Sequence, residues 1–312
     1  MKIGIVEKKD FSEPAFKRLS SIGVVEFFGD GSDLTTFLMD KDAIFVRLKH
    51  FWDKKLLAGA KSIKYICSPT TGLNHIDLDY CARRGIEVVS LKGEVDFLTE
   101  NIAATPEHTL GLTIALLRNY SRSFLSSDNP VWDRDRYKGE EIFEKKIGII
   151  GYGRVGRKYA KYLNSFGAKV FFYDIDKLKI TNGFAKRLSN WSELCEQCDI
   201  VAMCASYSKE YDSFFDKRYL KLLKNKYFIN TARGELVDER ELIKLISKGY
   251  FAGVGLDVIR NENGKNNLNK FIRLTKKSRN LIITPHIAGA THESMSKTEM
   301  FVAEKLIRIT KS

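Results

Sequence analysis

Short apolar segments alternate with amphipathic segments along the first hundred residues. The amphipathic segments, such as PAFKRLSSI and DLDYCARRG, have the spacing of helices. The apolar segments are rich in Val, Ile and Phe, which favour strands. We expect strands at KIGIV, VVEFF, AIFVRL, KYICS and EVVSL. Regular alternation of strand and helix predicts a parallel sheet with helices on both faces.

A long helical pattern follows, in which apolar residues recur at helical spacing from residue 100 to 125. It predicts one helix that links two domains. Pro106 lies inside this pattern and marks either the start of the helix or a kink. The polar, turn-rich segment SSDNPVWDRDRYKGEE comes next, and we expect it to be a connecting arm.

A second alternating series begins at KKIGIIGYG. Its expected strands are KKIGII, KVFFYD, DIVAMC, KYFINT, AGVGLDV and NLIITP, while RNENGKNNLNKF is expected to be a loop. After Pro285 only one helical segment remains, ESMSKTEMFVAEKLIRI. Because a lone helix cannot bury its apolar face, we expect it to pack on the first domain. The fold class is therefore α/β, with two Rossmann-like or flavodoxin-like domains built on doubly wound parallel sheets.

Composition adds a positive charge. The chain of 312 residues has 52 Lys and Arg against 39 Asp and Glu, a net charge of +13. Such a surface suits an anionic partner. However, the basic residues are spread along the chain, so a solvated basic surface is the simpler interpretation, and a nucleic-acid binder would lack a recognition motif. We find no signal peptide and no apolar run of about 18 residues, so we expect no membrane span and a cytoplasmic location.

The cysteine pattern is typical of reduced thiols. Five cysteines are scattered along the chain, an odd number that favours a reducing compartment. Cys195 and Cys198 form a C-x-x-C pair. A zinc site would need a second pair or nearby histidines, and none follows at suitable spacing. We interpret the pair as incidental and expect no metal.

The segment KKIGIIGYGRVGRKYAKYL carries the first chemical motif. An apolar strand runs into Gly151-Tyr152-Gly153-Arg154-Val155-Gly156 and then into a helix. Glycines in this pattern permit a tight turn, close approach of a pyrophosphate and close packing of helix on strand. Asp174 ends the next strand, where a carboxylate can bind an adenosine ribose and repel a 2′-phosphate. The motif predicts NAD as the cofactor in preference to NADP.

Three further strands end in polar residues. Arg233 follows the strand in KYFINTARG, and its guanidinium can bind a carboxylate with two hydrogen bonds. Asp257 ends the strand in AGVGLDV, and Glu262 follows in a loop. His286 ends the last strand. Because ligands bind outside the carboxyl ends of parallel strands, we expect these residues and the glycine loop to share one site.

With these residues the chain resembles the D-isomer-specific 2-hydroxyacid dehydrogenases. The resemblance covers nearly the whole chain. It rests on CSPTTGLNHIDL, ATPEHTLGL, IGIIGYGRVGRKYA, FINTARGELVDE, GLDV with the later glutamate, and ITPHIAGAT. It implies an NAD-dependent enzyme that interconverts a 2-oxo acid and a D-2-hydroxy acid. It also implies a substrate domain of residues 1–98 plus 288–312, an inserted NAD-binding domain of residues 99–287, and a homodimer formed through the inserted domain.

The resemblance also assigns residues. Arg233, Glu262 and His286 are the implied catalytic residues: Arg233 binds the substrate carboxylate and keto oxygen, and His286, paired with Glu262, is the acid/base. Thr71 and Gly72 belong to a loop that meets substrate, and Thr71 also meets cofactor. The remaining implied cofactor-binding residues are Gly151, Gly153, Arg154, Val155, Gly156, Asp174, Thr231, Ala232 and Asp257.

Arg47, two departures from the family pattern and an alternative function stay open in the sequence. Arg47 ends a strand in AIFVRLKH, where it is either a surface arginine or a second cation that binds an anionic substrate tail. The segment MCASYS replaces a pattern that often reads His-x-Pro in the family, and Asn263 follows Glu262 in place of the usual proline. An NAD(H)-sensing corepressor with little turnover is the alternative function, and the basic surface is the feature that favours it.

Overall fold

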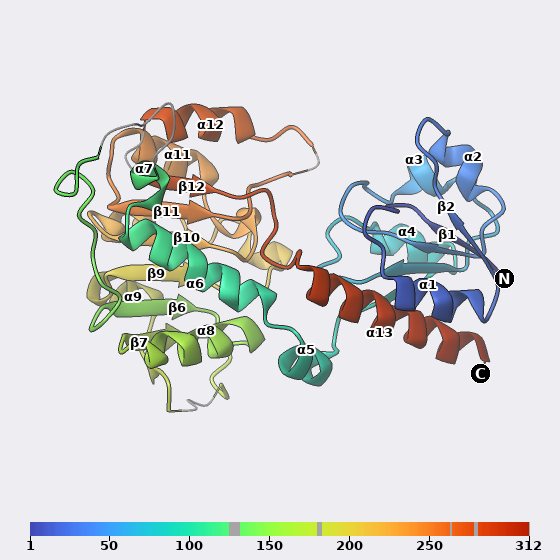
Figure 1. Cartoon of the computed structure of the whole chain (residues 1–312), viewed down its shortest axis with the longest axis horizontal. Coiled ribbons are helices and arrows are strands. Elements are labelled where there is room, and N and C mark those ends of the chain that lie inside the picture. The colour runs from blue at the N-terminus through green and yellow to red at the C-terminus, as the bar shows by residue number, and fades with distance from the viewer. Residues whose placement is uncertain (125–131, 180–182, 263, 278–279, 312) are drawn as a thin grey trace. The chain divides into compact units, whose positions relative to one another are not determined.

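The computed structural model describes residues 1–124, 132–179, 183–262, 264–277 and 280–311. The chain forms two compact units, one of residues 1–102 with 290–312 and the other of residues 103–289. The division falls a few residues from the expected boundaries because α5 (Val95–Asn101) ends in the first unit and α6 (Ala104–Leu117) begins the second. Figure 1 shows the chain passing between them once in each direction.

The first unit is built on a five-stranded parallel sheet with the order β2-β1-β3-β4-β5. Its strands are β1 (Lys2–Ile5), β2 (Val24–Phe27), β3 (Ala43–Phe45), β4 (Tyr65–Ser68) and β5 (Glu87–Ser90). Its other helices are α1 (Glu13–Ser20), α2 (Leu34–Leu38), α3 (Lys54–Leu57), α4 (Leu78–Arg83) and α13 (His292–Lys311). The C-terminal helix α13 runs beside α1, which confirms the expected return of the chain (Figure 1).

The second unit has a seven-stranded parallel sheet with the order β12-β11-β10-β9-β6-β7-β8. Its strands are β6 (Lys146–Ile150), β7 (Lys169–Tyr173), β8 (Lys186–Arg187), β9 (Ile200–Met203), β10 (Tyr227–Asn230), β11 (Gly253–Leu256) and β12 (Leu281–Ile283). The strand order reverses beside β6, and ligands of such sheets bind at that point, outside the carboxyl ends of the strands. The predicted α/β fold class is confirmed.

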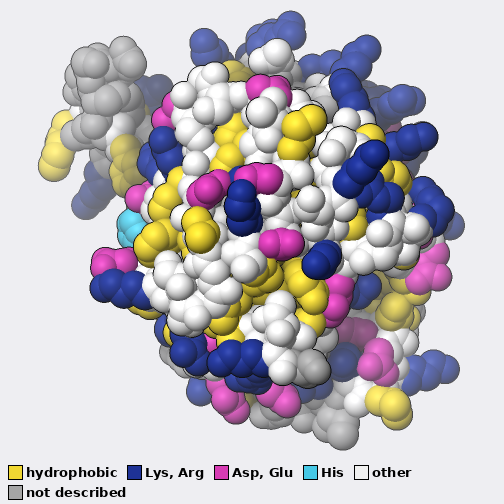
Figure 2. All heavy atoms as spheres, turned by 90° about the vertical axis from the view of Figure 1, so that its right-hand side faces the viewer, with side chains coloured by type: hydrophobic (Ala, Val, Ile, Leu, Met, Phe, Trp, Pro, Cys, Tyr) yellow, Lys and Arg dark blue, Asp and Glu magenta, His cyan; other side chains and the backbone are white. Residues whose placement is uncertain are grey.

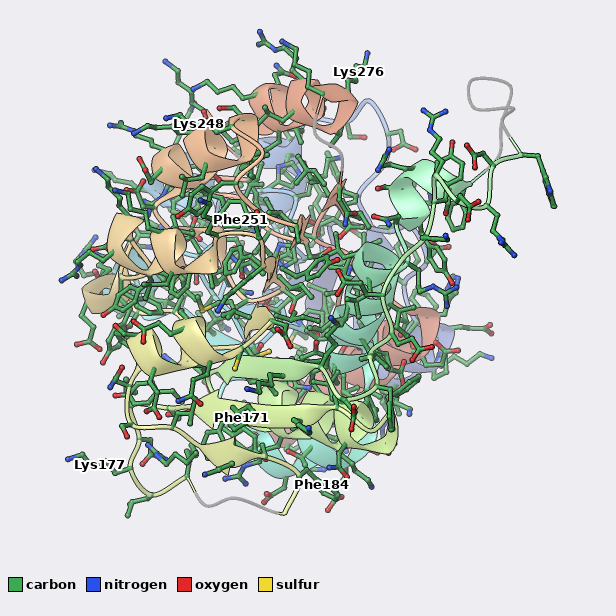
Figure 3. All side chains as sticks on the ribbon, turned by 90° about the vertical axis from the view of Figure 1, so that its left-hand side faces the viewer. Phe171, Lys177, Phe184, Lys248, Phe251 and Lys276 are labelled. Atoms are coloured by element: carbon green, nitrogen blue, oxygen red, sulfur yellow. The ribbon has the colours of Figure 1, made fainter. Side chains whose placement is uncertain are left out.

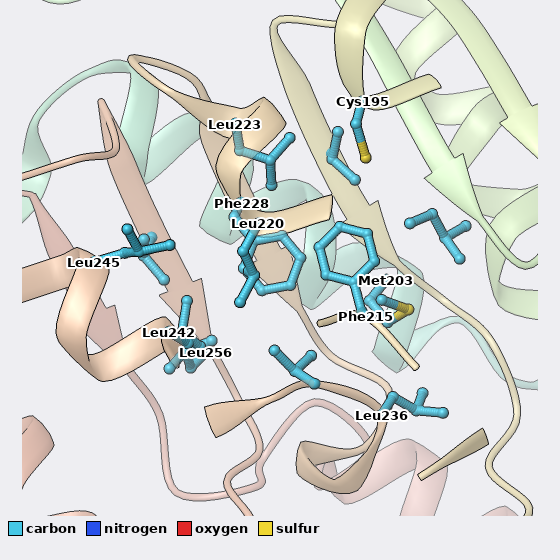
Figure 4. Packing of buried hydrophobic residues seen from close by; sticks show 14 of the residues in the cluster. Cys195, Met203, Phe215, Leu220, Leu223, Phe228, Leu236, Leu242, Leu245 and Leu256 are labelled. Carbon is cyan, nitrogen blue, oxygen red and sulfur yellow. The ribbon is translucent and has the colours of Figure 1, made fainter. Parts of the chain in front are cut away.

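Helices cover both faces of the larger sheet. In addition to α6 they are α7 (Tyr120–Ser123), α8 (Arg154–Ser165), α9 (Trp191–Gln197), α10 (Lys217–Leu220), α11 (Glu239–Ser247) and α12 (Leu268–Lys277). On one face, Phe215, Phe228, Leu220 of α10 and the leucines of α11 form a buried cluster (Figure 4). Phe215 stacks on Phe228 with ring centroids 5.4 Å apart. Burial of these rings holds the strand ends that carry the site in fixed positions.

Two sequence predictions are corrected, and one strand was missed. The single helix expected over residues 100–125 is α5, α6 and α7, because the backbone is not helical at Ile102 and because Asn119, with φ +54°, separates α6 from α7. The part of the expected arm at residues 126–131 lies outside the described residues. The strand β8 was missed because its two residues carry no apolar pattern. The expected loop RNENGKNNLNKF contains the start of α12, which buries Phe271.

The surface carries both signs of charge. Basic and acidic side chains are interspersed on the face drawn in Figure 2. Lys177, Lys248 and Lys276 extend into solvent on another face (Figure 3). Among the described residues, no helix is both long enough and apolar enough to cross a membrane.

Candidate active site

The glycine loop connects β6 to α8 as predicted from its sequence. Gly151 has φ +92°, and a Cβ there would lie 2.5 Å from Cα of Ala205, so only glycine fits the turn. A Cβ on Gly153 would meet no atom within 4 Å, so its backbone faces space. The helix then starts at Arg154, with Val155 and Gly156 in its first turn. This geometry presents backbone N–H groups to an anion.

A cavity of about 290 Å³ lies beside the loop. Gly151 and Gly153 form one side, and Asp174 with the aromatic ring of Trp191 lines another. Cys204 and Ser206, from the segment that departs from the family pattern, also line it. The cavity therefore joins the phosphate-binding glycines to the predicted ribose carboxylate, as a dinucleotide requires.

Asp174 is held in place by the backbone. Its Oδ2 accepts a hydrogen bond of 2.6 Å from the N–H of Tyr152, and its Oδ1 accepts one of 2.9 Å from the N–H of Asp176. The guanidinium of Arg187 donates hydrogen bonds to the backbone oxygens of Asp174, Asp176 and Lys179. These bonds stabilise the turn that follows β7. The carboxylate is fixed at the cavity wall.

Arg154 supplies a further test of the cofactor. Its Nη1 is buried and has no hydrogen-bond partner among the described residues. Burial lowers the pKa of this guanidinium, so a nearby anion would stabilise its charge. A pyrophosphate at the glycine loop supplies such an anion, so the residues present fit NAD.

Arg233 lies on a tight turn at the end of β10. The side chain of Asn230 spans this turn: its Oδ1 accepts from the N–H of Ala232 at 3.0 Å, and its Nδ2 donates to the oxygen of Arg233 at 2.9 Å. Thr231 is buried, with its Oγ1 2.8 Å from Oγ1 of Thr109. Burial lowers the pKa of Arg233, and the charges of Glu262, Glu235 and Asp257 oppose that change. The result is a partly buried cation on a turn that Asn230 fixes.

His286 and Glu262 form a direct pair. Nδ1 of His286 lies 2.5 Å from Oε2 of Glu262. Both side chains are partly exposed, at 25% and 30%. With Nδ1–H donated to the carboxylate, Nε2 is the ring nitrogen that can transfer a proton.

The backbone of His286 is strained, since it has φ +53°, in the left-handed region that few non-glycine residues adopt. Asp257 holds it there. The N–H of His286 donates to the backbone oxygen of Asp257 at 2.8 Å, and the next two N–H groups, of Ile287 and Ala288, donate to the Asp257 carboxylate at 2.9 Å each. The ring position of His286 thus depends on this aspartate.

Asp257 is bonded within its own unit, and the cofactor contact that the resemblance implies for it stays a prediction. Its side chain has no exposed surface. Thr284 Oγ1 donates to it at 2.6 Å, and Nε2 of His108 lies 3.4 Å away. Burial alone would raise the pKa of Asp257, but hydrogen bonds from His108, Thr284 and the two backbone N–H groups outweigh it and hold the pKa below its usual value. The carboxylate is a buried anchor for the histidine.

His108 and Thr284 both contact Asp257, and the sequence reasoning gave neither a role. Nε2 of His108 lies 3.1 Å from Oγ1 of Thr284. The signal was present, because His108 belongs to the motif ATPEHTLGL and Thr284 to ITPHIAGAT, but no role followed from the motifs alone.

The predicted residues of the first unit have their own environment. Thr71 and Gly72 follow β4 in a loop fixed by Thr70, whose Oγ1 donates to the oxygen of Gly72 at 2.9 Å. Their contacts with substrate and cofactor stay predictions.

Arg47 is engaged within the first unit. Its Nη2 lies 2.5 Å from Oε1 of the fully buried Glu299, and its Nη1 donates to the oxygen of Lys9 at 2.8 Å. These bonds give Arg47 a structural role in the first unit, and its contact with an anionic substrate tail stays a prediction.

The C-x-x-C pair lies in the core of the second unit. Cys195 and Cys198 are buried in the core, and burial raises the pKa of each thiol to about 12. All five cysteines are free. In the described part of the chain, no group of three or more His, Cys, Asp or Glu side chains could hold a metal ion. The pair is part of the packing.

Comparison with known proteins identifies a family that the chain resembles along most of its length. The model of the D-isomer-specific 2-hydroxyacid dehydrogenase NAD-binding domain matches residues 110–288. The chain is 33% identical over 288 residues to a glyoxylate reductase of Thermofilum pendens, which covers 89% of this chain and 81% of the relative. It is 28% identical over 302 residues to a D-3-phosphoglycerate dehydrogenase of Methanocaldococcus jannaschii, covering 95% of this chain. The chain spans only 55% of that relative.

Solved structures give the same result. The structure of a D-lactate dehydrogenase of Aquifex aeolicus, complexed with NAD and lactic acid, superposes with a TM-score of 0.81 and 25% sequence identity. The alignment covers 99% of this chain and 95% of that one.

Proposed function

The chain belongs to the D-isomer-specific 2-hydroxyacid dehydrogenase family, and from this premise we propose that Arg233, Glu262 and His286 carry out its reaction. The protein is an NAD-dependent oxidoreductase that interconverts 2-oxo and D-2-hydroxy acids. The observation that carries the residue assignment is the pair formed by His286 and Glu262, in the same unit as Arg233.

NADH, when bound, supplies the hydride that reduces the keto carbon of the substrate. Arg233 binds the substrate carboxylate and stabilises negative charge on the keto oxygen, because a desolvated guanidinium interacts strongly with anions. His286 delivers a proton from Nε2 to that oxygen. Glu262 orients the ring through Nδ1 and stabilises its protonated form. Hydride and proton together convert the carbonyl into a hydroxyl group.

The rest of the site assignment supports this arrangement. Gly151, Gly153, Arg154, Val155 and Gly156 hold the cofactor pyrophosphate, and Asp174 binds the ribose. Thr231 and Ala232 border the cofactor beside the substrate arginine. Thr71 and Gly72 bind the substrate from the first unit.

The proposal also covers the two domains, the oligomeric state and the cellular location. The unit of residues 1–102 with 290–312 is the substrate domain, and the unit of residues 103–289 is the NAD-binding domain. Through the latter the protein forms a homodimer. Five free thiols support a reducing, cytoplasmic location.

A substrate screen tests the proposed function. Purified protein is mixed with NADH and with glyoxylate, hydroxypyruvate, phosphorylated hydroxypyruvate or pyruvate, and the loss of NADH absorbance is followed. The proposal expects turnover of at least one 2-oxo acid and a product of D configuration. Binding of NADH without turnover of any 2-oxo acid would contradict it.

A further inference from the structure

The catalytic partner Glu262 lies on a segment whose two ends are fixed by one side chain. This segment connects β11 to α12. At its start, the N–H of Arg260 donates to Oε2 of Glu239 at 2.7 Å. At its end, Nδ2 of Asn267 donates to Oε1 of the same carboxylate at 2.6 Å. Glu239 is 5% exposed, so both bonds are shielded from water.

Glu239 itself is well supported. It is the first residue of α11, whose N-terminal end favours a negative charge, and the side chain of Asp238 caps the helix by accepting from the N–H of Glu241. The carboxylate therefore projects from a rigid element, whereas Glu262 lies between elements. A side chain on a helix can hold a residue of a neighbouring loop within the small positional error, about 0.5 Å, that catalysis allows.

Further contacts hold the segment between β11 and α12 in place. The N–H of Asn261 donates to Oε1 of Glu235 at 3.2 Å, and Nδ2 of Asn266 donates to the oxygen of Glu262 at 2.9 Å. Gly234 approaches so closely that a Cβ there would lie 2.1 Å from the carbonyl carbon of Ile259. The turn that carries Arg233 and the segment that carries Glu262 are thus packed backbone against backbone.

From these contacts we propose that Glu239 is a positioning residue, which keeps Glu262 within hydrogen-bonding distance of His286. This inference rests on the proposed function of the pair. It assigns Glu239 no contact with substrate or cofactor. Its action on the reaction passes entirely through the position of Glu262.

The charges around Glu262 explain why position matters. Arg233 attracts Glu262 electrostatically, while Glu235 and Asp257 also act on that arginine. The carboxylate of Glu262 thus interacts with the charge of Arg233 while it contacts His286 directly. If the segment is released, Glu262 can move toward Arg233, and the imidazole then loses its anion while the substrate arginine gains a competitor.

The test uses two matched substitutions in one helix region. Asn267→Asp replaces the donated N–H with a second carboxylate beside Glu239. Asn269→Asp makes the same change two residues later, where the side chain is exposed. We expect Asn267→Asp to lower kcat for keto reduction about tenfold or more, because small misplacements at a reacting centre are costly. It should also raise KM for the 2-oxo acid, with NADH binding unchanged. Asn269→Asp should behave as wild type.

The pH dependence separates positioning from a general loss of stability. Asn267→Asp should shift the pH profile of keto reduction toward acid, as Glu262→Gln does. In the Glu262→Gln background, Asn267→Asp should cause no further shift. Glu239→Ala should reproduce the effect of Asn267→Asp and, in hydrogen exchange of the folded protein, speed exchange at the Arg260 amide.

The outcomes distinguish the two claims. If Glu262→Gln changes neither kcat nor the pH profile, the proposed function of the pair fails, and this inference fails with it. If Glu262→Gln has its expected effect but folded Asn267→Asp retains the wild-type kcat and pH profile, the positioning role alone is overturned. Additive shifts in the double variant would overturn it as well.

Discussion

Nδ1 of His286 lies 2.5 Å from Oε2 of Glu262, although 24 residues separate them along the chain. The two side chains follow β11 and β12, which are hydrogen-bonded neighbours in a parallel sheet. Parallel pairing brings their carboxyl ends to one edge, and the strained backbone of His286 turns its ring toward the acid. The pair is therefore a product of the sheet and of the Asp257 anchor together.

Replacing the carboxylate should change the pH dependence of reduction. Glu262→Gln keeps the size of the side chain but removes the charge that stabilises the protonated imidazole. Because the reduction needs that proton, the variant should lose activity at lower pH than wild type, so the falling limb of kcat/KM against pH shifts toward acid. Glu293→Gln, on the exposed start of α13, is the control. An identical profile in both variants would assign the proton to another group.

Cofactor preference should depend on Asp174. Its fixed carboxylate repels a 2′-phosphate, so Asp174→Ser should relax the preference for NADH over NADPH. The ratio of kcat/KM for the two cofactors measures the effect, and Asp79→Ser, on the exposed surface of α4, is the control. Equal use of both cofactors by the wild-type protein would show that Asp174 does not select between them.

Arg47→Ala should destabilise the first unit. The change leaves the buried Glu299 carboxylate without its cation, which typically costs about 3–5 kcal/mol of folding free energy. Burial already raises the pKa of Glu299, and loss of Arg47 raises it further. A raised folded-state pKa means that the carboxylate costs stability only where it is ionised. The defect should therefore be small near pH 4 and grow as pH rises toward neutrality.

Thermal unfolding of Arg47→Ala, wild type and the exposed Lys49→Ala control at several pH values measures this effect. Kinetics on phosphorylated and unphosphorylated hydroxypyruvate complete the test. Unchanged stability with a selective loss of kcat/KM on the phosphorylated substrate would instead identify Arg47 as a ligand for an anionic tail.

The thiols should be unreactive while the protein is folded. Burial raises the pKa of Cys195, Cys198 and Cys204 to about 12 and that of Cys81 to about 11, so almost no thiolate forms near pH 8. A chromogenic disulfide reagent should label the cysteines of the native protein slowly. After unfolding, it should label all five cysteines. Rapid labelling of Cys195 or Cys198 in the native protein would contradict their assignment to the core.

Much of the site could be predicted because its residues follow strands of one parallel sheet. Gly151, Arg233, Glu262 and His286 each come after an apolar run, and the carboxyl ends of such runs meet at one edge. The fold class followed from the same alternation. The local apolar pattern and the meeting of strand ends at one sheet edge were therefore sufficient to predict the fold class and these site residues.

Long-range polar partners could not be predicted in the same way. Arg47 and Glu299 are 252 residues apart, and Glu239 and Arg260 meet through a side chain and a backbone N–H. Nothing in the local sequence says which distant group a polar side chain faces. The start of α12 was missed for another reason: the Asn- and Lys-rich loop before it runs without a break into the helix, although the helix itself is amphipathic.

Turnover by a His286→Gln variant shows whether this histidine supplies the proton. Removing a general acid typically costs about 10²–10⁴-fold in rate, so kcat for the preferred 2-oxo acid should fall by that order. NADH affinity, measured by fluorescence titration, should stay within the range of wild type and of the exposed His292→Gln control. A His286→Gln protein that binds NADH and reduces the 2-oxo acid at the wild-type rate would contradict the account.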